Sequence, residues 1–450
     1  MNSLATVILA AGKGTRMKSK TIKVLHKLAG KSMLQHLIDT VTKMSSEKTV
    51  TVIGYQGEKV KESIKGENLS YVYQHNQKGT GHAVLQAKDE LTDFNGNTLV
   101  LYGDAPLLTR ETLQKMVETH NESQASATIL STCLDDPTGY GRIVRDEDDN
   151  FLKIVEQSDL SSQAEEDINE INTGICVFDN QKLFEALDKV EPDNEQGEYY
   201  LTDVFSILLS EGAKVEVMIT EDPEETIGIN DRVRLAEAEQ IIRRRINERV
   251  MRSGVTLINP ATTFIDEDVE IGQDTIVHPF THIEGKTVIG EDVIIGPHTR
   301  IQNAKIGAKV NITQSTILDS TIHEKVKVGP FAYIRPGNEI HAEAKIGDFV
   351  ELKKSTIGKG SKVPHLSYVG DAQVGENCNI GAGTITANYD GENKHKTKLG
   401  NGVFIGSNST LVAPVELKDG ASTGAGSVVT KDVPNDTTVV GVPARKFNKK

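Results

Sequence analysis

The first forty residues hold glycines and cations whose types suit the binding of an anion. The stretch LAAGKGTRMKSKTIK, residues 9–23, directly follows a short apolar run. Seven basic residues precede the first acidic residue of the chain, Asp39: Lys13, Arg16, Lys18, Lys20, Lys23, Lys27 and Lys31. Backbone N–H groups converge where a strand leads into a helix, and anions bind there. We therefore predict a phosphate-binding loop that opens toward a helix, with a plain tight connection as the alternative.

Two familiar glycine motifs do not describe this loop. It has Gly12 and Gly14 but not the third glycine of GxGxxG, and it lacks the Gly-Lys-Ser/Thr spacing of a P-loop. The loop is therefore predicted neither as a dinucleotide-binding turn nor as a P-loop.

A second candidate for chemistry is His365, in the stretch KVPHLSYVGD. A neutral imidazole suits a general base because its unperturbed pKa lies near the working pH. Most single histidines have a structural or solvated role, so the argument depends on the neighbours. These are Arg335 in YIRPG, Lys353 in ELKK, Tyr368, and the pair Asn388 and Tyr389.

The elements that must position these residues follow two different rhythms. Up to residue 229, short β-branched runs such as ATVILAA and TLVLYGD alternate with amphipathic stretches such as RETLQKMVETH. This pattern predicts an α/β domain with a mainly parallel, buried sheet, which binds ligands at the carboxyl ends of its strands. Asp104 ends one such run and is expected at that edge, with a simple turn residue as the alternative.

Residues 230–251 read as one connecting helix, because they contain no Gly or Pro and place apolar residues on one face. The RRR run at 243–245 is interpreted as a solvated face of this helix rather than a binding patch.

From residue 252 onward, an apolar residue recurs at every sixth position. One series is Ile271, Val277, Ile283, Ile289, Ile295 and Ile301, and another is Ile322, Val328, Ile334, Ile340, Ile346 and Leu352. A hexapeptide repeat predicts a triangular solenoid of roughly nine coils, with the β-branched residue of each wall inside. This resembles the left-handed parallel β-helix of hexapeptide acyltransferases, and the handedness comes from the resemblance. The count fails between Ile380 and Leu399, so TANYDGENKHKTK is predicted to leave the prism as a loop.

Bulk composition sets limits on partners and location. A chain of 450 residues predicts two or more domains. A net charge of −14 argues against a nucleic-acid or membrane partner. The three cysteines have no CxxC spacing, the N-terminus lacks a secretory signal, and no apolar run approaches membrane-spanning length. We expect a cytoplasmic protein.

Several motifs together resemble a known enzyme family. LAAGKGTRM, Lys23, QHNQKGTGHA and LYGDAPL look like the sugar-1-phosphate nucleotidyltransferases. With GYGRIV, VEQ, INTGI, GEYYLTD and the hexapeptide half, the chain resembles the bacterial bifunctional N-acetylglucosamine-1-phosphate uridylyltransferase/glucosamine-1-phosphate acetyltransferases over essentially its whole length. The resemblance implies a uridylyltransferase domain at 1–229, a helical linker at 230–251 and an acetyltransferase β-helix at 252–450.

The resemblance also implies roles for residues of the first domain. The residues matching the uridine and phosphate contacts are Leu9, Ala10, Ala11, Gly12 and Lys23, with Arg16 where the triphosphate is neutralised. The uracil would be read by Gln74, Gly79 and Thr80. Tyr102 and Gly103 precede Asp104, which would hold Mg²⁺ together with Asn230. Positions matching the acetylglucosamine contacts are Gly141, Glu156 and Asn172.

In the second domain, the resemblance assigns His365 as the general base that deprotonates the glucosamine amine as it attacks acetyl-CoA. The sugar-phosphate contacts would be Arg335, Lys353, Tyr368, Asn379, Asn388 and Tyr389, and the coenzyme A side would be Ala382, Ser407 and Ala425. The family assembles as homotrimers. Its substrates are UTP, N-acetylglucosamine-1-phosphate, glucosamine-1-phosphate and acetyl-CoA, and its product is a precursor of bacterial cell-wall polymers.

Two positions depart from the family pattern. The proline that often precedes the phosphate-binding lysine is replaced by Ile22, and no arginine precedes Val442-Pro443, although Arg445 follows them. Two alternatives stay open from the residues alone. One is a single-activity sugar-1-phosphate nucleotidyltransferase whose β-helix serves only oligomerisation, and the other is a non-catalytic sugar-nucleotide sensor.

Overall fold

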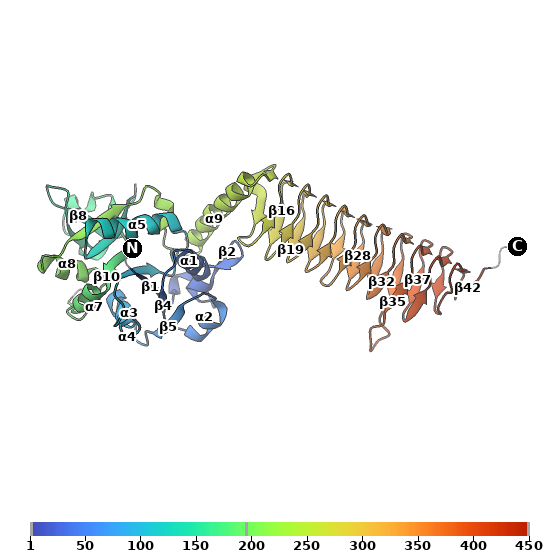
Figure 1. Cartoon of the computed structure of the whole chain (residues 1–450), viewed down its shortest axis with the longest axis horizontal. Helices are drawn as coiled ribbons and strands as arrows, with labels where there is room; N and C mark the ends of the chain where they lie inside the picture. Colours follow the sequence, from blue (N-terminus) through green and yellow to red (C-terminus); the bar gives the residue numbers. More distant parts are fainter. Residues whose placement is uncertain (1–2, 194–196, 448–450) are drawn as a thin grey trace. The chain divides into compact units, whose positions relative to one another are not determined.

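The computed structural model describes residues 3–193 and 197–447. The chain divides into two units, Met1–Ile242 and Arg243–Lys450 (Figure 1). The division falls inside one long helix, α9 (Arg232–Arg252).

The first unit is built on one mixed sheet. Its strands, in spatial order, are β11 (Val215–Ile219), β7 (Ala127–Cys133), β10 (Glu170–Asp179), β6 (Asn97–Tyr102), β1 (Leu4–Ala10), β4 (Lys48–Ile53) and β5 (Leu69–Tyr73), with β8 (Arg142–Arg145) and β9 (Phe151–Val155) attached at β10. All neighbouring pairs of the main path are parallel except those of β10, which runs antiparallel to both β6 and β7. The predicted mainly parallel sheet is confirmed.

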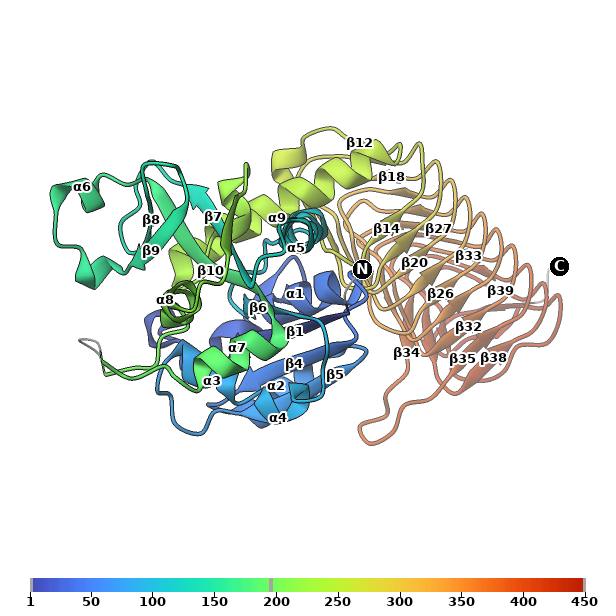
Figure 2. The same cartoon turned by 60° about the vertical axis from the view of Figure 1, so that its left-hand side comes forward.

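Helices cover both faces of this sheet (Figures 1 and 2). They are α1 (Met33–Thr42), α2 (Gly57–Ser63), α3 (Thr80–Leu85), α4 (Lys88–Leu91), α5 (Arg110–Ser123), α7 (Asn180–Leu187) and α8 (Asp203–Ser210). The short helix α6 (Gln163–Glu166) lies in the segment between β9 and β10 and buries no residue. Successive strand residues point to opposite faces, so Val7 and Val100 enter one core while Ile8 and Leu99 enter the other. A sheet buried on both faces requires the near-continuous apolar runs seen in the sequence.

Helix α9 buries the apolar face predicted for it. Ala238, Ile242 and Ile246 are buried. The interpretation of RRR as a solvated face is wrong for Arg243. Its guanidinium lies 5.2 Å from the Phe264 ring centroid and donates to the carbonyl of Ile265, so Arg243 contacts the first coil of its own unit.

The second unit is a left-handed parallel β-helix with three walls. The first wall contains β12 (Thr256–Leu257), β15 (Ile276–Val277), β18 (Ile294–Ile295), β21 (Asn311–Ile312), β24 (Lys327–Val328), β27 (Lys345–Asp348), β30 (Lys362–His365), β33 (Asn379–Ile380), β36 (Phe404–Ile405), β39 (Ser422–Thr423), β41 (Thr438–Val440) and β42 (Arg445–Lys446).

The second wall contains β13 (Thr263–Ile265), β16 (Thr281–Glu284), β19 (Arg300–Gln302), β22 (Thr316–Leu318), β25 (Tyr333–Ile334), β28 (Glu351–Lys353), β31 (Tyr368–Gly370), β34 (Ile385–Ala387), β37 (Thr410–Val412) and β40 (Val428–Val429). The third contains β14 (Glu270–Ile271), β17 (Val288–Ile289), β20 (Lys305–Ile306), β23 (Thr321–Ile322), β26 (Glu339–Ile340), β29 (Thr356–Ile357), β32 (Ala372–Val374), β35 (Thr397–Leu399) and β38 (Val415–Leu417).

The hexapeptide positions form the interior of this prism. The predicted inward residues are buried from Val277 to Leu417, whereas Ile271 in the first coil is only half-buried. Each wall residue stacks on its counterpart one coil later, as Ile334 does on Leu352. Short strands whose apolar side chains point into the prism therefore form the solenoid that the repeat predicts.

One segment leaves the prism between β34 and β35, where the repeat count fails. In Figures 1 and 2 it projects as a hairpin-like loop, and an antiparallel bridge joins Tyr389 and Lys394 within it.

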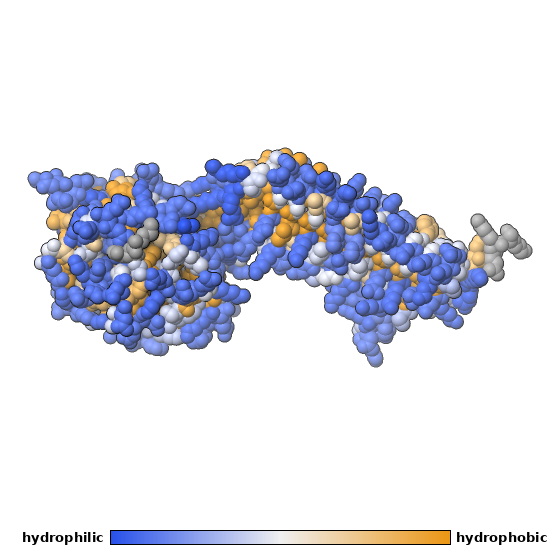
Figure 3. All heavy atoms as spheres, in the orientation of Figure 1, coloured by the Kyte–Doolittle hydropathy of each residue, from blue (hydrophilic) through white to orange (hydrophobic). Residues whose placement is uncertain are grey.

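Apolar side chains also lie on the outside of the β-helix, where Figure 3 shows patches of hydrophobic surface. Four of them occupy corner positions that follow strands of the first wall, and all are at least half exposed: Phe280, Phe331, Phe349 and Leu366. The rings of Phe331 and Phe349 stack from one coil to the next, with centroids 5.2 Å apart. Within the described residues, no helix is both long and apolar enough to cross a membrane.

Candidate active sites

A pocket lies at the carboxyl ends of β1 and β6, where a parallel sheet is expected to bind ligands. Ten residues predicted from the sequence line it: Leu9, Ala10, Ala11, Gly12, Lys23, Gln74, Gly79, Thr80, Tyr102 and Asp104. The N–H of Gly103 donates to the carbonyl of Leu9 at 2.9 Å, so this bond ties the turn after β6 to the end of β1. The sheet therefore brings two distant motifs to one place.

The loop after β1 does not open toward an α-helix as predicted. It enters a single 3-10 turn, Thr15–Met17, flanked by Gly14 and Lys18 in left-handed conformations. Gly14 lies before the first residue of the turn, and Lys18 ends the turn after three residues. A Cβ atom at Gly14 would lie 2.5 Å from Cβ of Lys23, so glycine is needed there for the loop to pass against that lysine.

The loop brings Lys23 between two predicted metal ligands. Its ammonium donates to the carboxylate of Asp104 and, at 3.1 Å, to Oδ1 of Asn230. Arg16 donates to the same Asn230 oxygen at 3.0 Å. Mg²⁺ binds carboxylate and amide oxygens, and the side-chain oxygens of Asp104 and Asn230 both contact the ammonium of Lys23. The residues present therefore fit a divalent cation.

The other cations of the N-terminal cluster face elsewhere. Lys13, Lys18, Lys20 and Lys27 are exposed, and Lys31 pairs with Asp39 at 2.7 Å. Lys23 and Arg16 are thus the members of the cluster whose contacts reach the predicted metal ligands.

The uracil-reading residues predicted from the sequence form a tight turn. Gln74 is buried, and its amide nitrogen lies 3.1 Å from the carbonyl of Gly79 and 3.0 Å from Nδ1 of His82. Gly79 has φ +106°, and a Cβ there would lie 2.5 Å from the carbonyl oxygen of Tyr199. The hydroxyl of Thr80 accepts from the N–H of Leu201 at 3.0 Å. The side chain of Gln77, which sequence reasoning missed, donates to the carbonyl of Ala11 at 2.5 Å.

The three residues predicted for acetylglucosamine lie together beside this pocket. The N–H of Asn172 donates to the carbonyl of Gly141 at 2.8 Å, and a Cβ on Gly141 would lie 3.2 Å from a carboxylate oxygen of Glu156. Burial raises the pKa of Glu156, and Thr202 donates to its carboxylate at 3.4 Å. Sequence reasoning missed Thr202, although GEYYLTD contains it.

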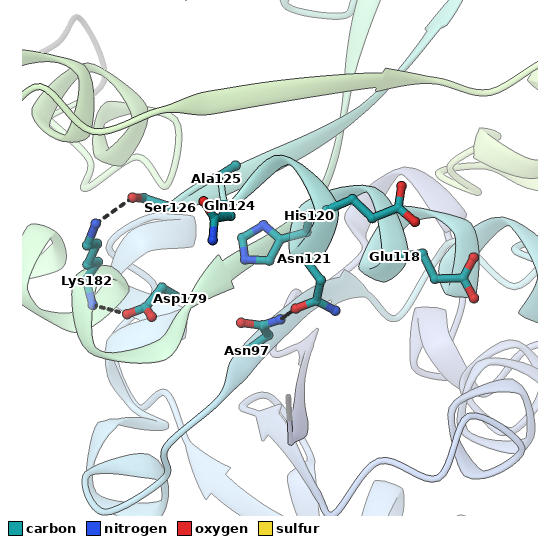
Figure 4. A pocket seen from close by; sticks show the side chains of 10 residues that line it. Asn97, Glu118, His120, Asn121, Gln124, Ala125, Ser126, Asp179 and Lys182 are labelled. Carbon is teal, nitrogen blue, oxygen red and sulfur yellow. Dashed lines mark hydrogen bonds between the residues drawn. The ribbon is translucent and has the colours of Figure 1, made fainter. Parts of the chain in front are cut away.

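A larger pocket of about 700 Å³ in the same unit holds none of the predicted residues (Figure 4). It lies at the amino ends of β6 and β7, where the side chain of Asn97 donates to Asn121 at 2.9 Å and Lys182 donates to Ser126 at 2.7 Å. Ligands of parallel sheets bind at the opposite edge, where the smaller pocket and its ten predicted residues lie.

In the β-helix, His365 lies in a column of corner residues along the first wall. His365 lies two residues after buried Val363, and Ala382, Ser407 and Ala425 have the same offset in later coils. A Cβ on Gly381 would lie 2.6 Å from the nitrogen of Ser407, and one on Gly406 would lie 2.6 Å from the nitrogen of Ala425. The coils thus stack the histidine and the three predicted coenzyme A contacts along one edge.

Asp371, which sequence reasoning missed, connects two predicted sugar-phosphate residues. Its Oδ2 accepts from Lys353 at 3.1 Å and from Asn388 at 2.5 Å, and Asn388 also lies 3.4 Å from the hydroxyl of Tyr368. The extruded loop adds Lys394, whose pKa is lowered by the neighbouring ammonium of Lys353. Two cations side by side favour an anionic ligand.

The remaining predicted residues lie on the same coils. Arg335 donates to Glu351 at 2.8 Å, and Glu351 is paired in register with Tyr368. Asn379 pairs with Lys362 on the strand that ends at His365, and Tyr389 is exposed on the loop. Cys378 is buried, which raises the pKa of its thiol, and its Sγ contacts the carbonyl of Gly400 at 3.0 Å, consistent with a structural role.

Sequence comparisons cover both units. Residues 5–223 match the family described as nucleotidyl transferase, and residues 268–303 and 396–431 match the bacterial transferase hexapeptide family. The chain is 51% identical over 449 residues to the bifunctional protein GlmU of Halalkalibacterium halodurans, covering 100% of this chain and 98% of that protein. It is 53% identical over 443 residues to that of a Geobacillus species, covering 98% of this chain and 96% of that protein. It is 48% identical over 450 residues to the bifunctional protein GlmU of Listeria monocytogenes, covering 100% of this chain and 98% of that protein.

These similarities extend through both units and both residue clusters, rather than through one half of the chain. The chain belongs to the family of bifunctional GlmU proteins.

Proposed function

We infer that the chain is a bifunctional transferase of UDP-N-acetylglucosamine synthesis. It transfers an acetyl group from acetyl-CoA to glucosamine-1-phosphate, and it transfers a uridylyl group from UTP to N-acetylglucosamine-1-phosphate with release of pyrophosphate. The observation that carries this function is the similarity of 48–53% identity to bifunctional relatives along the whole chain. The single-activity alternative is disfavoured because it leaves the residues around His365 without a role.

We assign uridylyl transfer to residues 1–229, a helical linker to 230–251 and acetyl transfer to 252–450. The sugar phosphate already carries a nucleophilic oxygen, so attack on the α-phosphorus needs no activated serine or cysteine. What the site must supply is charge neutralisation and in-line placement of two anions. Lys23 and Arg16 supply the positive charge from the chain itself.

Mg²⁺ would be held by Asp104 and Asn230 and, when bound, neutralises charge on the phosphate oxygens. Leu9, Ala10, Ala11 and Gly12 face the nucleotide, and Gln74, Gly79 and Thr80 read its base. Glu156, Gly141 and Asn172 orient the sugar beside Tyr102 and Gly103.

In the β-helix, His365 accepts the proton of the glucosamine amine as the amine attacks the thioester. Such a base contributes about 10²- to 10⁴-fold in rate. Arg335, Lys353, Tyr368, Asn379, Asn388 and Tyr389 hold the sugar phosphate. Ala382, Ser407 and Ala425 leave room along the prism edge for coenzyme A.

A homotrimer is part of this proposal. The exposed corner side chains Phe280, Phe331, Phe349 and Leu366 support it, because a second copy of the prism would remove them from water. Sedimentation at about three times the chain mass of 49.0 kDa is expected. The free state of Cys133, Cys176 and Cys378 supports a cytoplasmic location.

One experiment tests both activities together. The protein is incubated with glucosamine-1-phosphate, acetyl-CoA, UTP and Mg²⁺, and the sugar products are analysed by mass. Asp104→Ala is expected to abolish pyrophosphate release and keep acetylation, and His365→Ala is expected to do the reverse. Loss of both activities from either folded variant would contradict two independent sites.

A further inference from the structure

Asp348 lies directly beside the predicted base in the β-helix. Oδ1 of Asp348 is 2.5 Å from Nδ1 of His365. The two residues are paired in register between β27 and β30, and each follows its buried wall residue, Ile346 or Val363, by two positions. The stacking of adjacent coils therefore fixes their separation, and the contact does not depend on a flexible loop.

This contact determines which nitrogen of the imidazole can act as a base. A carboxylate that accepts from Nδ1–H keeps the proton on that nitrogen and leaves the lone pair on Nε2. It also fixes the ring plane and stabilises the imidazolium that forms when Nε2 takes a second proton. An aspartate carboxylate is ionised at neutral pH, and the hydrogen bond from His365 lowers the pKa of Asp348 further.

The other polar contacts near this site leave that role to Asp348. Glu351 is engaged by Arg335, and Asp371 is engaged by Lys353 and Asn388. Among the described residues, Asp348 is the one whose carboxylate forms a hydrogen bond with the His365 ring.

We propose that Asp348 is a positioning residue for acetyl transfer, which holds His365 with Nδ1 protonated and Nε2 presented to the amine of the substrate. The inference rests on the proposed role of His365 as the general base. It adds a carboxylate–imidazole pair formed across two coils, which the sequence reasoning did not contain.

Kinetics of Asp348→Ala give the first test. Acetyl transfer, followed as free coenzyme A thiol, is expected to lose about 10- to 100-fold in kcat, less than the 10²- to 10⁴-fold contributed by a general base. KM for glucosamine-1-phosphate and for acetyl-CoA is expected to stay within about twofold, since Asp348 acts through the histidine. Uridylyl transfer by the same preparation reports correct folding.

Glu291→Ala is the matched control. Glu291 is an exposed acidic corner residue that follows buried Ile289 by two positions, the same offset that Asp348 has from Ile346. This variant is expected to keep wild-type acetyl transfer. A wild-type kcat for Asp348→Ala, or a rise in KM with kcat unchanged, would overturn the positioning role.

The tautomer of His365 provides a readout independent of activity. Full-length protein labelled with ¹⁵N-histidine is examined by magic-angle-spinning NMR, and the signal is assigned by its loss in His365→Gln. The expected wild-type state has Nδ1 protonated, with a shift toward Nε2 protonation in Asp348→Ala. Nε2 protonation in the wild type overturns the proposal.

If wild-type protein shows Nδ1 protonation but transfers no acetyl group, the proposed function fails, and the positioning role in that reaction fails with it. If wild-type protein transfers acetyl but Asp348→Ala is unimpaired, only the present inference fails.

Discussion

The ammonium of Lys23 bridges Asp104 and Asn230, residues that lie 81 and 207 positions further along the chain. A cation of the protein thus lies between the two oxygens expected to hold Mg²⁺. The same lysine is the predicted phosphate ligand, so the predicted phosphate site and the predicted metal ligands share one ammonium group.

Replacing Lys23 by alanine is expected to reduce kcat/KM for UTP by about 10²- to 10³-fold, the usual loss when one positioned donor to a developing charge is removed. Pyrophosphate release measures this effect, and acetyl transfer should not change. Lys20→Ala is the control, because Lys20 is an exposed member of the same basic cluster. An equal loss in both variants would point to general positive charge rather than to the position of Lys23.

Two glycines of the nucleotide pocket are expected to respond differently to alanine. A Cβ on Gly12 meets no protein atom within 4 Å, so Gly12→Ala should keep its thermal stability but raise KM for UTP by filling space in the pocket. Gly79 has φ +106°, and its Cβ would lie 2.5 Å from a backbone oxygen, so Gly79→Ala should also lose about 1–3 kcal/mol of stability. Melting curves measure the stability of the two variants, and UTP titrations measure their KM. Equal melting temperatures for both variants would contradict this distinction.

Asp371→Ala is expected to impair acetyl transfer about 10-fold or more, although Asp371 was not predicted to touch substrate. Its carboxylate holds both Lys353 and Asn388, and a buried lysine left without this partner loses its fixed position. KM for glucosamine-1-phosphate should rise most, since both held residues are predicted sugar-phosphate contacts. Uridylyl transfer serves as the internal control, and an unchanged KM would exclude the role.

His120 should make the stability of the first unit depend on pH. Burial lowers the pKa of His120 from 6.5 to about 4, and Nδ1 bonds Thr128 at 2.9 Å. Because the folded pKa is depressed, the unfolded chain binds the proton more readily. The free energy of unfolding therefore has its full value above about pH 6.5 and falls as the pH approaches 4. The loss is on the order of 3 kcal/mol, because each unit of pKa difference corresponds to about 1.4 kcal/mol.

Urea unfolding followed at 222 nm measures this effect in the first unit, because the helices α1 to α8 lie there while the second unit is a β-helix. His120→Gln is expected to flatten the curve between pH 4 and 6.5. A curve of unchanged slope would assign the acid sensitivity to other groups.

The periodicity of the chain was enough to predict the β-helix. A six-residue repeat of Ile and Val places every apolar side chain in one core when three short strands form each coil, as residues from Val277 to Leu417 do. The left-handedness of the coil came from the family resemblance. The failure of the count after Ile380 likewise predicted the loop. In the first unit, apolar runs on both faces predicted a buried sheet, and motifs at strand ends predicted the edge at which Asp104 lies.

Tertiary structure decided which side chains meet. Of seven nearby cations, Lys23 reaches Asp104 because the left-handed residues Gly14 and Lys18 flank a single 3-10 turn, and Gly14 lets the loop pass close against Lys23. Composition does not encode this path. The length of a coil also varies, from 17 residues between Ile346 and Val363 to 25 residues between Ile380 and Ile405. Counting residues therefore does not give the register that places Asp348 beside His365, or Asp371 beside Asn388. Local pattern fixes which residues are inside, whereas contacts between distant residues depend on the exact length of every turn between them.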